Sequence, residues 1–464
     1  LAARRVDGAE QFFTRANDFG FSKNPEETWQ HWDREKVLAD VVWVIRLFKP
    51  RLLVTRFSPL PAATHGHHTA SAQLAVEAFF AAGDSTRFPE QLSQVRVWQP
   101  SRLVWNTSWW FYGRQDYDKT GLLSLDVGGY NPRLGRSYGE LAAESRSMHQ
   151  SQGFGAARQR GSEREYFQWL AGDSAIHDPL EGLERSVMNG TASTDWDEWA
   201  RGVRGLYALL ETENTEAWLK GLAPLIPFLD RILEDPTRSD EDRLLARERK
   251  EKVNRLLAEI SGLWEEAVAA QPAVVPGDSL NWEWQVLRRN PSATVKVVPL
   301  SLRLLGLWPN GQERTLWDGK TAPTANDLGD SLHRYAFRAA LPAGMPMSGP
   351  FWKAEGPRSA HYSVPDFGSH RPESPPSLMV ESRWLWSIEA MEIPVTLRTP
   401  LLYKWTDPVL GERYRPMEVL PTWQVSLEPR QLVVPDGVRE LRFRLSLRME
   451  KGPTAPNRTD TLRW

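Results

Sequence analysis

The segment LLVTRFSPLPAATHGHHTASAQLAVEAFFAA, residues 52–82, determines how the N-terminal part of this chain is interpreted. It begins with a short apolar and β-branched run that is typical of a parallel strand buried on both faces. A helical pattern follows over residues 69–82, and Gly83 ends it. Between the two lies a polar loop, residues 64–68, which we call the histidine loop. It holds three of the nine histidines of the chain, namely His65, His67 and His68.

Further helices and strands flank this segment. Apolar residues at helical spacing over residues 26–48 predict a helix that Pro50 ends. Short apolar runs predict strands at residues 95–98, 102–106 and 122–127, and a helix is predicted at residues 137–150. Helix, strand, loop and helix form the repeating unit of an α/β sheet, in which ligands gather at the carboxyl ends of strands. The sequence therefore predicts an α/β domain over residues 1–193 with a site at the histidine loop.

The rest of the chain changes character twice. Residues 194–278 predict a helical insert or spacer, in which a helix capped by Ser239 carries one apolar stripe of Val253, Leu256, Leu257, Ile260, Leu263 and Trp264. After residue 278 the apolar period becomes two, which is typical of β-sandwich strands. The alternation is strict in RELRFRLSLR, residues 439–448, at Leu441, Phe443, Leu445 and Leu447. We predict one β-sandwich over residues 279–420 and the start of a second β-sandwich unit over residues 421–464, and we leave open whether that second unit is truncated.

Composition excludes several classes of protein. The chain of 464 residues is 41% hydrophobic and 25% charged, as in folded globular proteins, and its length suggests several cores. Its formal net charge is −2, and we find no dense block of Lys and Arg, so neither nucleic acid nor anionic lipid is indicated as a partner. The chain has no cysteine, which excludes disulfides and thiolate metal sites. No apolar run is long enough for a membrane span.

The histidine loop has two interpretations. Neutral imidazole is the commonest side-chain ligand of Zn²⁺, and a catalytic zinc takes three protein ligands and a water. His65, His67 and His68 cannot all reach one ion from a tight loop, so only one or two of them would be ligands. The alternative is a polar loop whose histidines cap the following helix or form local hydrogen bonds. Spacing alone does not decide between them.

Several segments resemble one enzyme family. The run VIRLFKPRLLVTRFSPLPAATHGHHTASAQLAVEAFFAAGD, residues 44–84, resembles the block of the PIG-L/LmbE zinc-dependent N-deacetylases that contains a His-Pro-Asp-His loop. RANDFGFSKNPEET (15–28) and SYGELAAESRSMHQSQGFG (137–155) resemble further blocks of the large, multidomain bacterial members. DPVLGERYRP (407–416) resembles part of their C-terminal extension. The resemblance implies a Rossmann-like α/β deacetylase domain.

The resemblance also implies roles for individual residues. His68 matches the zinc ligand of the family loop, and His65 matches the histidine that acts as general acid or stabilises the tetrahedral oxyanion. The loop Asp and Pro of the family are replaced by His67 and Gly66. Asp18 lies where simpler members place an acidic residue in the pocket, although a helix-terminal cap would explain it equally well. His149 and Gln152 match a family element in the pocket wall and are candidate substrate contacts, with a structural hydrogen bond as the alternative.

One family motif has no counterpart here. Family members open with a strand followed by Ala-His-Pro-Asp-Asp-Glu, which supplies a His and an Asp to zinc and a second Asp as the base. This chain contains no such string and begins LAARRVDGAE, with Leu1, Arg5 and Ala9 at helical spacing. We therefore expect that an upstream segment has been removed. We also expect the chain alone to be an incomplete, inactive fragment that lacks one His and one Asp ligand.

The implied activity is zinc-dependent removal of an acetyl group from an N-acetylated sugar or glycoconjugate. A second hypothesis is a non-catalytic carbohydrate-binding or scaffold protein on a degenerate deacetylase fold. Tryptophan clusters such as TSWWFYGR (107–114) and NWEWQ (281–285) could stack on sugar rings, whereas most tryptophans in a chain of this size belong to cores. Accessory β-sandwiches on a bacterial hydrolase favour a periplasmic or extracellular location.

Overall fold

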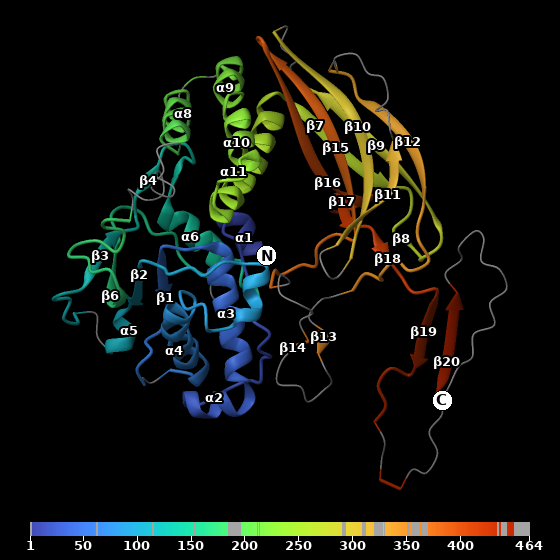
Figure 1. Ribbon diagram of the computed structural model, residues 1–464. Helices are drawn as coiled ribbons and strands as arrows, with labels where there is room; N and C mark the ends of the chain where they lie inside the picture. Colours follow the sequence, from blue (N-terminus) through green and yellow to red (C-terminus); the bar gives the residue numbers. More distant parts are fainter. Residues whose placement is uncertain are drawn as a thin grey trace. The chain divides into compact units, whose positions relative to one another are not determined.

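The computed structural model describes residues 2–61, 64–113, 116–152, 155–183, 196–210, 212, 214–289, 294–308, 312–319, 328, 330–349, 353–354, 362–363, 370–433, 436–437 and 443–449. The chain divides into two units, each with its own internal contacts (Figure 1). Unit 1 comprises Leu1–Gly190 and Pro350–Ser374, and unit 2 comprises Thr191–Gly349 and Pro375–Trp464. The domain boundaries expected at residues 193, 278 and 420 stay predictions.

Unit 1 contains a four-stranded sheet in the order β1 (Leu52–Thr55), β2 (Arg102–Thr107), β6 (Arg164–Gly172) and β3 (Leu123–Asp126). Strands β1 and β2 are parallel, and β6 runs antiparallel to both β2 and β3. The strands predicted at 52–57, 102–106 and 122–127 are confirmed, whereas β6 was not predicted. The predicted burial of β1 on both faces is wrong, because β1 lies at an edge of the described sheet and Val54 is 51% exposed.

The strand predicted at residues 95–98 is wrong. Residues 96–100 have no regular structure. Trp98 donates its backbone N–H to the Ala82 carbonyl (2.9 Å) and its indole N–H to the Pro50 carbonyl (2.7 Å). These bonds tie the segment to a helix end and a loop, so its alternating pattern has no neighbouring strand to pair with.

The helices of unit 1 are α1 (Ala2–Asp7), α2 (Pro25–His31), α3 (Arg34–Phe48), α4 (Gly66–Ala81), α5 (Trp109–Tyr112) and α6 (Tyr138–Ser147). The single helix predicted at 26–48 is two helices, because the Asp33 side chain accepts the Lys36 N–H and starts α3. Helices α3 and α4 lie side by side (Figure 1) and share a core. Its buried residues include Val37, Leu38, Val42 and Ile45 on α3 and Leu74 and Ala78 on α4.

A buried arginine fixes the connection that follows α4. Arg46 on α3 is fully buried. Its guanidinium donates hydrogen bonds to the Gln91 side chain and to the carbonyl groups of Ala81, Ala82, Asp84, Arg87 and Phe88. Burial lowers the pKa of Arg46, but arginine stays protonated in proteins. The side chain therefore holds residues 81–91 around one buried charge.

A segment that lies between the two parts of unit 2 in sequence belongs to unit 1. The Tyr362 N–H donates to the Arg15 carbonyl (2.7 Å), and His370 Nδ1 lies 3.0 Å from the Phe13 carbonyl. His370 is 2% exposed and its Nε2 lies 3.6 Å from the Asp40 carboxylate, which also binds Arg15. Burial lowers the pKa of His370, although Asp40 opposes the shift. Tyr362 and His370 thus bind a part of unit 1 that lies more than three hundred residues earlier in the chain.

The described part of unit 2 opens with the helices α8 (Trp196–Ala208), α9 (Thr215–Leu222), α10 (Leu225–Glu234) and α11 (Asp240–Ile260). The predicted cap is confirmed, because Ser239 Oγ accepts the Asp242 N–H (3.0 Å). The prediction that the apolar stripe of this helix includes Leu263 and Trp264 is wrong, because the helix ends before them. Gly262 has φ +74°, which ends the helix, and β7 (Leu263–Ala269) follows.

A large curled sheet follows these helices in unit 2. Its order is β11 (Glu313–Gly319), β10 (Val295–Leu307), β15 (Leu378–Ile388), β16 (Met391–Asp407), β7, β9 (Ser279–Arg288) and β12 (His333–Ala340), and β17 (Gly411–Pro416) also pairs with β16. The long strand β16 pairs with β15 up to Pro400 and with β7 from Leu401, so it joins two halves of the sheet. The described residues confirm a mixed α/β chain with a β-rich C-terminal region.

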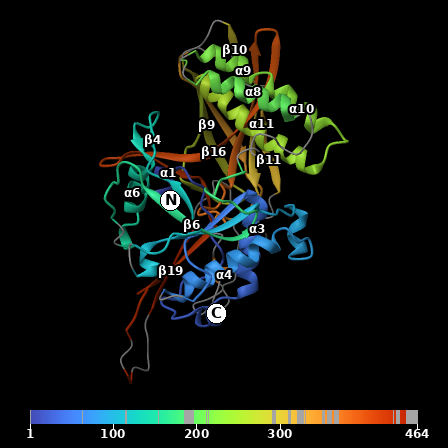
Figure 2. The same ribbon diagram turned by 90° about the vertical axis from the view of Figure 1, so that its left-hand side faces the viewer.

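Aromatic side chains fill the interior of the curled sheet. The ring centroids of Trp284 and Trp384 lie 5.5 Å apart, and those of Trp282 and Trp317 lie 5.6 Å apart. Trp282 and Trp284 are each 1% exposed, so the NWEWQ cluster belongs to the core and is closed to sugars. Helices α8–α11 share this core with the sheet, as their position beside it in Figure 2 suggests. The side chains of Trp109 and Trp110 lie outside the described residues.

A carboxyl group also faces this interior. Glu265 on β7 accepts hydrogen bonds from Ser382 Oγ (2.8 Å), Thr399 Oγ1 (2.9 Å) and the Trp284 indole N–H (3.2 Å). Burial raises the pKa of Glu265, and this effect exceeds the opposite effect of the donors. Because the pKa of Glu265 is higher in the folded than in the unfolded chain, this group stabilises the fold at pH values below its unfolded pKa. That stabilisation is lost as the pH rises through its folded pKa.

We therefore expect Glu265→Gln to change how stability depends on pH. Between about pH 5 and pH 8 the melting temperature of unit 2 should fall more in the wild type than in the variant, by a difference on the order of a few °C. Thermal unfolding at several pH values measures this difference. Glu234→Gln, at an exposed position on α10, is the control and should follow the wild type. Parallel curves for all three proteins would contradict the prediction.

Candidate functional site

The histidine loop follows β1 at the edge where the parallel strands β1 and β2 end, as predicted. Aromatic residues from both strands gather there. The Phe57 ring stacks on His68 with centroids 3.7 Å apart and planes 1° apart. Phe111 on α5 contacts Phe57 (5.7 Å) and Trp105 on β2 (5.2 Å). His68 therefore lies against an aromatic wall at the carboxyl end of the parallel pair.

Helix α4 begins earlier than predicted. It starts at Gly66 and not at Thr69, because the Gly66 N–H donates to the Ser22 carbonyl (2.8 Å) and His65 takes the N-cap position. The His65 side chain makes no capping hydrogen bond, so helix capping does not explain this residue. His67 and His68 lie in the first turn of the helix.

Only glycine fits at position 66. A Cβ atom there would lie 2.1 Å from the Asn24 carbonyl oxygen and 2.7 Å from Ser22 Oγ. The close approach of the two backbones brings residues 22–24 against the start of α4. Gly66 thus has a structural reason in this chain.

His67 has a local structural role. Its Nδ1 lies 2.9 Å from Ser22 Oγ, which also bonds Thr28 (2.8 Å). Its ring stacks on Phe19 with centroids 4.4 Å apart. Burial lowers the pKa of His67, while Asp18 acts in the opposite direction. Ser22 and Phe19 therefore position the His67 ring.

Asp18 is exposed and lies near enough to His67 to affect its pKa. Its Oδ1 accepts the Gly20 N–H (3.2 Å), which closes a short turn. The helix-cap interpretation of Asp18 is wrong, because the cap of the next helix is Asn24, whose side chain accepts the Glu27 N–H. Asp18 therefore lies near His67 of the histidine loop and does not cap a helix.

His65 and His68 form a pair. Their ring centroids lie 5.5 Å apart and their planes are tilted by 44°. Two imidazoles on one tetrahedral zinc lie about 5 Å apart, given Zn–N distances of about 2.0–2.1 Å. Burial lowers the pKa of His68, and His65 and His67 lower it further, which favours the neutral imidazole. The spacing would place His65 beside an ion held by His68, but the described residues include no group of three His, Asp or Glu side chains that could hold a metal.

The two candidate substrate contacts lie on another element. His149 follows α6, is exposed, and its Nδ1 lies 3.2 Å from the Arg146 carbonyl. It also contributes to the lowered pKa of Asp7 on α1, although desolvation, which acts in the opposite direction, is the largest influence on that group. None of these contacts of His149 involves the histidine loop. Gln152 ends a 3₁₀ turn (Gln150–Gln152), and its side chain lies outside the described residues.

Sequence reasoning missed a polar network at the same edge of the sheet. Asn106, at the end of β2, donates to Glu165 Oε2 (2.8 Å) and accepts a hydrogen bond from Arg56, just after β1. These three residues come from three strand ends, and no local pattern connects them. They present donors and acceptors of the kind that bind sugar hydroxyls.

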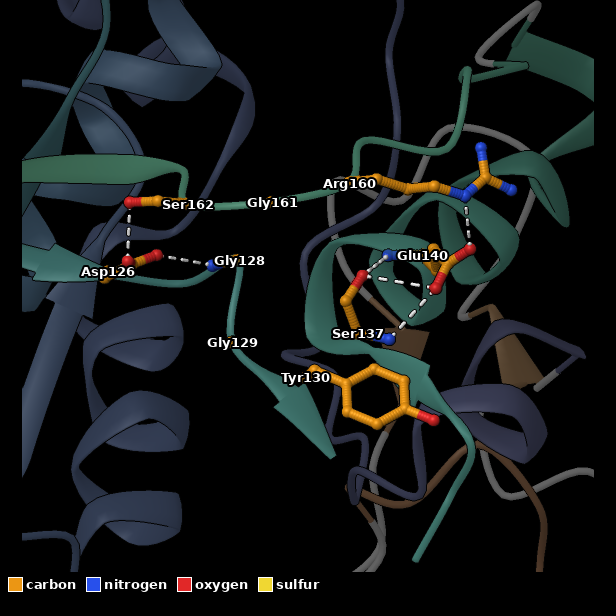
Figure 3. Close-up of a pocket in the computed structure, with 9 residues that line it drawn as sticks. All are labelled: Asp126, Gly128, Gly129, Tyr130, Ser137, Glu140, Arg160, Gly161 and Ser162. Carbon is orange, nitrogen blue, oxygen red and sulfur yellow. Dashed lines mark hydrogen bonds and ion pairs between the residues drawn. The ribbon is translucent and has the colours of Figure 1, made fainter. Parts of the chain in front are cut away.

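A pocket of about 470 Å³ lies beyond the end of β3, lined by Asp126, Gly128, Gly129, Tyr130, Ser137, Glu140, Arg160, Gly161 and Ser162 (Figure 3). Asp126 accepts hydrogen bonds from Ser162 Oγ (2.6 Å) and the Gly128 N–H (2.9 Å), and the Ser162 bond is the main reason that its pKa is lowered. Glu140 binds Arg160 Nε (2.9 Å) and caps α6 together with Ser137. These carboxylates hold the surrounding loops. The Ser137-x-x-Glu140 spacing was the available sequence signal.

Comparisons with known proteins assign the chain to no family. No protein-family model and no curated protein matches the chain. Among solved structures, the sporulation control protein Spo0M of Bacillus subtilis is 11% identical with a TM-score of 0.16, over 30% of this chain and 48% of that one. Red sea bream transglutaminase is 12% identical with a TM-score of 0.18, over 43% and 22%. The DNA glycosylase AlkC of Pseudomonas fluorescens is 7% identical with a TM-score of 0.15, over 45% and 52%. Scores this low carry no argument about fold or function.

The helices give one further result. Within the described ranges, none is both long and apolar enough to cross a bilayer.

Proposed function

We propose that this chain carries part of the active site of a zinc-dependent N-deacetylase of the PIG-L/LmbE type, on a Rossmann-like domain. The substrate would be an N-acetylated sugar or glycoconjugate. The observation that supports the proposal is the pair of His65 and His68, 5.5 Å apart, at the carboxyl end of a parallel strand pair. This is the place where α/β folds bind ligands.

The proposal gives roles to two residues of the histidine loop and to three residues outside it. His68 is a zinc ligand, and its neutral imidazole has a lone pair available at pH 7. Bound zinc would polarise the amide carbonyl and lower the pKa of a bound water. His65, which is exposed and beside His68, stabilises the oxyanion or protonates the leaving amine. Asp18 borders the site, and His149 and Gln152 remain candidate contacts for the substrate.

The burial of His68 also predicts how zinc affinity depends on pH. Because the pKa of His68 is lowered, protons compete with zinc for this imidazole only at pH values below the usual pKa range of histidine. The stacked Phe57 ring fixes the plane of the imidazole and keeps water from one face. Phe57 thus positions His68 as a hydrogen-bonding partner would in other zinc sites.

We expect the 464-residue chain to bind zinc weakly and not to deacetylate N-acetylglucosamine derivatives, because His68 alone does not complete a site. Competition with a chromophoric chelator measures the affinity. His68→Ala should abolish the remaining binding, whereas His65→Ala should retain it; loss of zinc in His65→Ala would mean that the two roles are exchanged. His177→Ala, at an exposed loop position of the same unit, is the control and should match the wild type.

A chimera tests the activity itself. Fusing the first strand and the Ala-His-Pro-Asp-Asp-Glu motif of the family to the N-terminus should give stoichiometric zinc and deacetylation, and His68→Ala should remove both. Stoichiometric zinc in the His68→Ala chimera would contradict the ligand assignment. Tight zinc and turnover by the 464-residue chain alone would contradict the family roles. An inactive chimera that binds N-acetylated sugars would favour the alternative, a carbohydrate-binding protein on a deacetylase fold.

A further inference from the structure

The pocket beyond the end of β3 is formed by three loops and has room for a small ligand. Its volume of about 470 Å³ lies within the usual range of ligand sites. Asp126 lies on one side of the pocket and Glu140 on the other, and three glycines of the lining contribute no side chain to the space between them (Figure 3). The ring of Tyr130 borders this space and is 65% exposed.

The two carboxylates keep part of their capacity to accept hydrogen bonds. An ionised carboxylate accepts about four. Asp126 accepts three, one from a serine hydroxyl and two from backbone N–H groups. Glu140 also accepts three, two from Ser137 and one from Arg160 Nε. Each carboxylate therefore has about one acceptor position left for a donor in the pocket.

The charge of the lining limits the class of ligand. A serine hydroxyl lowers the pKa of Asp126 and a backbone N–H lowers that of Glu140, so both are ionised at neutral pH. Arg160 is the one cation among the lining residues, which leaves one net negative charge and disfavours anionic ligands. An uncharged ligand with several hydroxyl donors fits. A sugar ring has such hydroxyls and a C–H face that packs on an aromatic ring such as that of Tyr130.

The sheet places this pocket at the same edge as the histidine loop. Strands β1 and β2 are parallel, and β6 is antiparallel to both β2 and β3, so β3 runs in the same direction as β1. Asp126, the last residue of β3, therefore lies at the edge where the histidine loop follows β1. With strands about 4.8 Å apart, the three spacings from β1 to β3 amount to roughly 15 Å. One sugar ring does not span this distance, whereas a row of several rings does.

We propose that this pocket binds one uncharged sugar ring of an N-acetylated glycan while another unit of the same glycan lies at the histidine pair. The substrate is then an oligosaccharide or a longer glycan and not a free monosaccharide. Asn106 on β2 and Glu165 on β6 lie on the two strands between these sites and offer contacts to the intervening sugars. Sugar binding follows from the pocket lining, and its link to the histidine pair rests on the deacetylase proposal.

Ligand-observed NMR titration of the zinc-free 464-residue chain tests the pocket directly. The probe is the linear trimer of N-acetylglucosamine, for which we expect a dissociation constant on the order of 1 mM. Tyr130→Ala removes the aromatic face and should weaken binding by about tenfold. Tyr207→Ala, at a tyrosine of α8 that is 62% exposed, is the control and should match the wild type. No binding of the trimer, or equal binding by the Tyr130→Ala chain, would overturn the proposal.

A charged sugar tests the electrostatic argument. Glucuronate should bind at least about tenfold more weakly than glucose, because its carboxylate meets a lining of the same sign. Asp126→Asn removes one negative charge and should reduce this difference, whereas Asp116→Asn, at an exposed position of the same unit, should preserve it. Because the readout is a ratio of two affinities, a partial loss of stability in Asp126→Asn does not obscure it. Equal affinity of the wild type for the two sugars would contradict the assigned class of ligand.

Turnover by the chimera separates this proposal from the deacetylase proposal. If both hold, kcat/KM for the trimer should exceed that for N-acetylglucosamine by at least about tenfold, and Tyr130→Ala should reduce this ratio. Tyr130-dependent binding without deacetylation would support the sugar pocket and contradict the deacetylase proposal. Deacetylation with equal kcat/KM for the two substrates, unaffected by Tyr130→Ala, would overturn the role of the pocket and leave the deacetylase proposal standing.

Discussion

Arg46→Met should lower the free energy of unfolding of unit 1 by about 3–5 kcal/mol. Arg46 is fully buried, and its guanidinium binds six acceptors in the connection after α4. Methionine fills a similar volume but donates no hydrogen bond, so all six acceptors lose the guanidinium; the carbonyls of Ala81, Ala82, Asp84 and Phe88 keep only a backbone N–H donor. Because a typical domain is stable by only about 5–15 kcal/mol, much of unit 1 would open. Hydrogen exchange in α3 and α4 reports this change separately from unit 2.

Two further variants make the comparison specific. Arg34→Met lies on the same helix but replaces a partly exposed arginine, so we expect a change of at most about 1 kcal/mol. Arg46→Lys keeps the charge but has a single donor group in place of the planar fork, so its stability should lie between the wild type and Arg46→Met. If Arg46→Met were as stable as Arg34→Met, the connection would not depend on the buried guanidinium.

Gly66→Ala is the second change with a large expected effect. Its Cβ would lie 2.1 Å from the Asn24 carbonyl oxygen, and a backbone atom cannot move aside as a side chain can. Residues 22–24 or the start of α4 must shift, at a cost of about 3 kcal/mol. The shift would also break the bond between the Gly66 N–H and the Ser22 carbonyl, and so move the histidine pair.

The measurements are denaturant unfolding and zinc affinity, and both should decrease in Gly66→Ala. Gly155→Ala is the matched control in the same unit, because nothing lies within 4 Å of its added Cβ. A Gly66→Ala protein with the stability and zinc affinity of the control would show that the two backbones can separate at little cost.

Local sequence patterns predicted much of unit 1 because they report local interactions. The strand at Leu52–Thr55 and the helix that follows it show continuous apolar or helical spacing, and both are present. The failures occur where a single residue or a distant contact overrides the pattern. Asp33 restarts a helix within an otherwise helical run, and Gly262 ends one despite an apolar residue at helical spacing. Residues 95–98 alternate like a strand but bond to a helix end.

The candidate site shows the same limit. The closeness of His65 and His68 follows from their spacing in the chain, so the sequence was sufficient to predict the pair. The contact of Ser22 with His67 joins residues 45 positions apart, and no periodicity could indicate it. The polar network of Arg56, Asn106 and Glu165 depends on the sheet order, in which β6 inserts next to β2.

The return of residues 350–374 to unit 1 has a consequence for synthesis on the ribosome. Asp40 emerges early, but His370, which lies against it, emerges only after residues 191–349 of unit 2 have been made. At about 5–20 residues per second, those residues alone take roughly 10 to 30 s. Unit 1 therefore lacks residues 350–374 for as long as residues 191–349 of unit 2 are being synthesised. A stalled or prematurely ended translation product would leave the pocket of His370 open, and with it an exposed carboxylate that quality-control proteases and chaperones could reach.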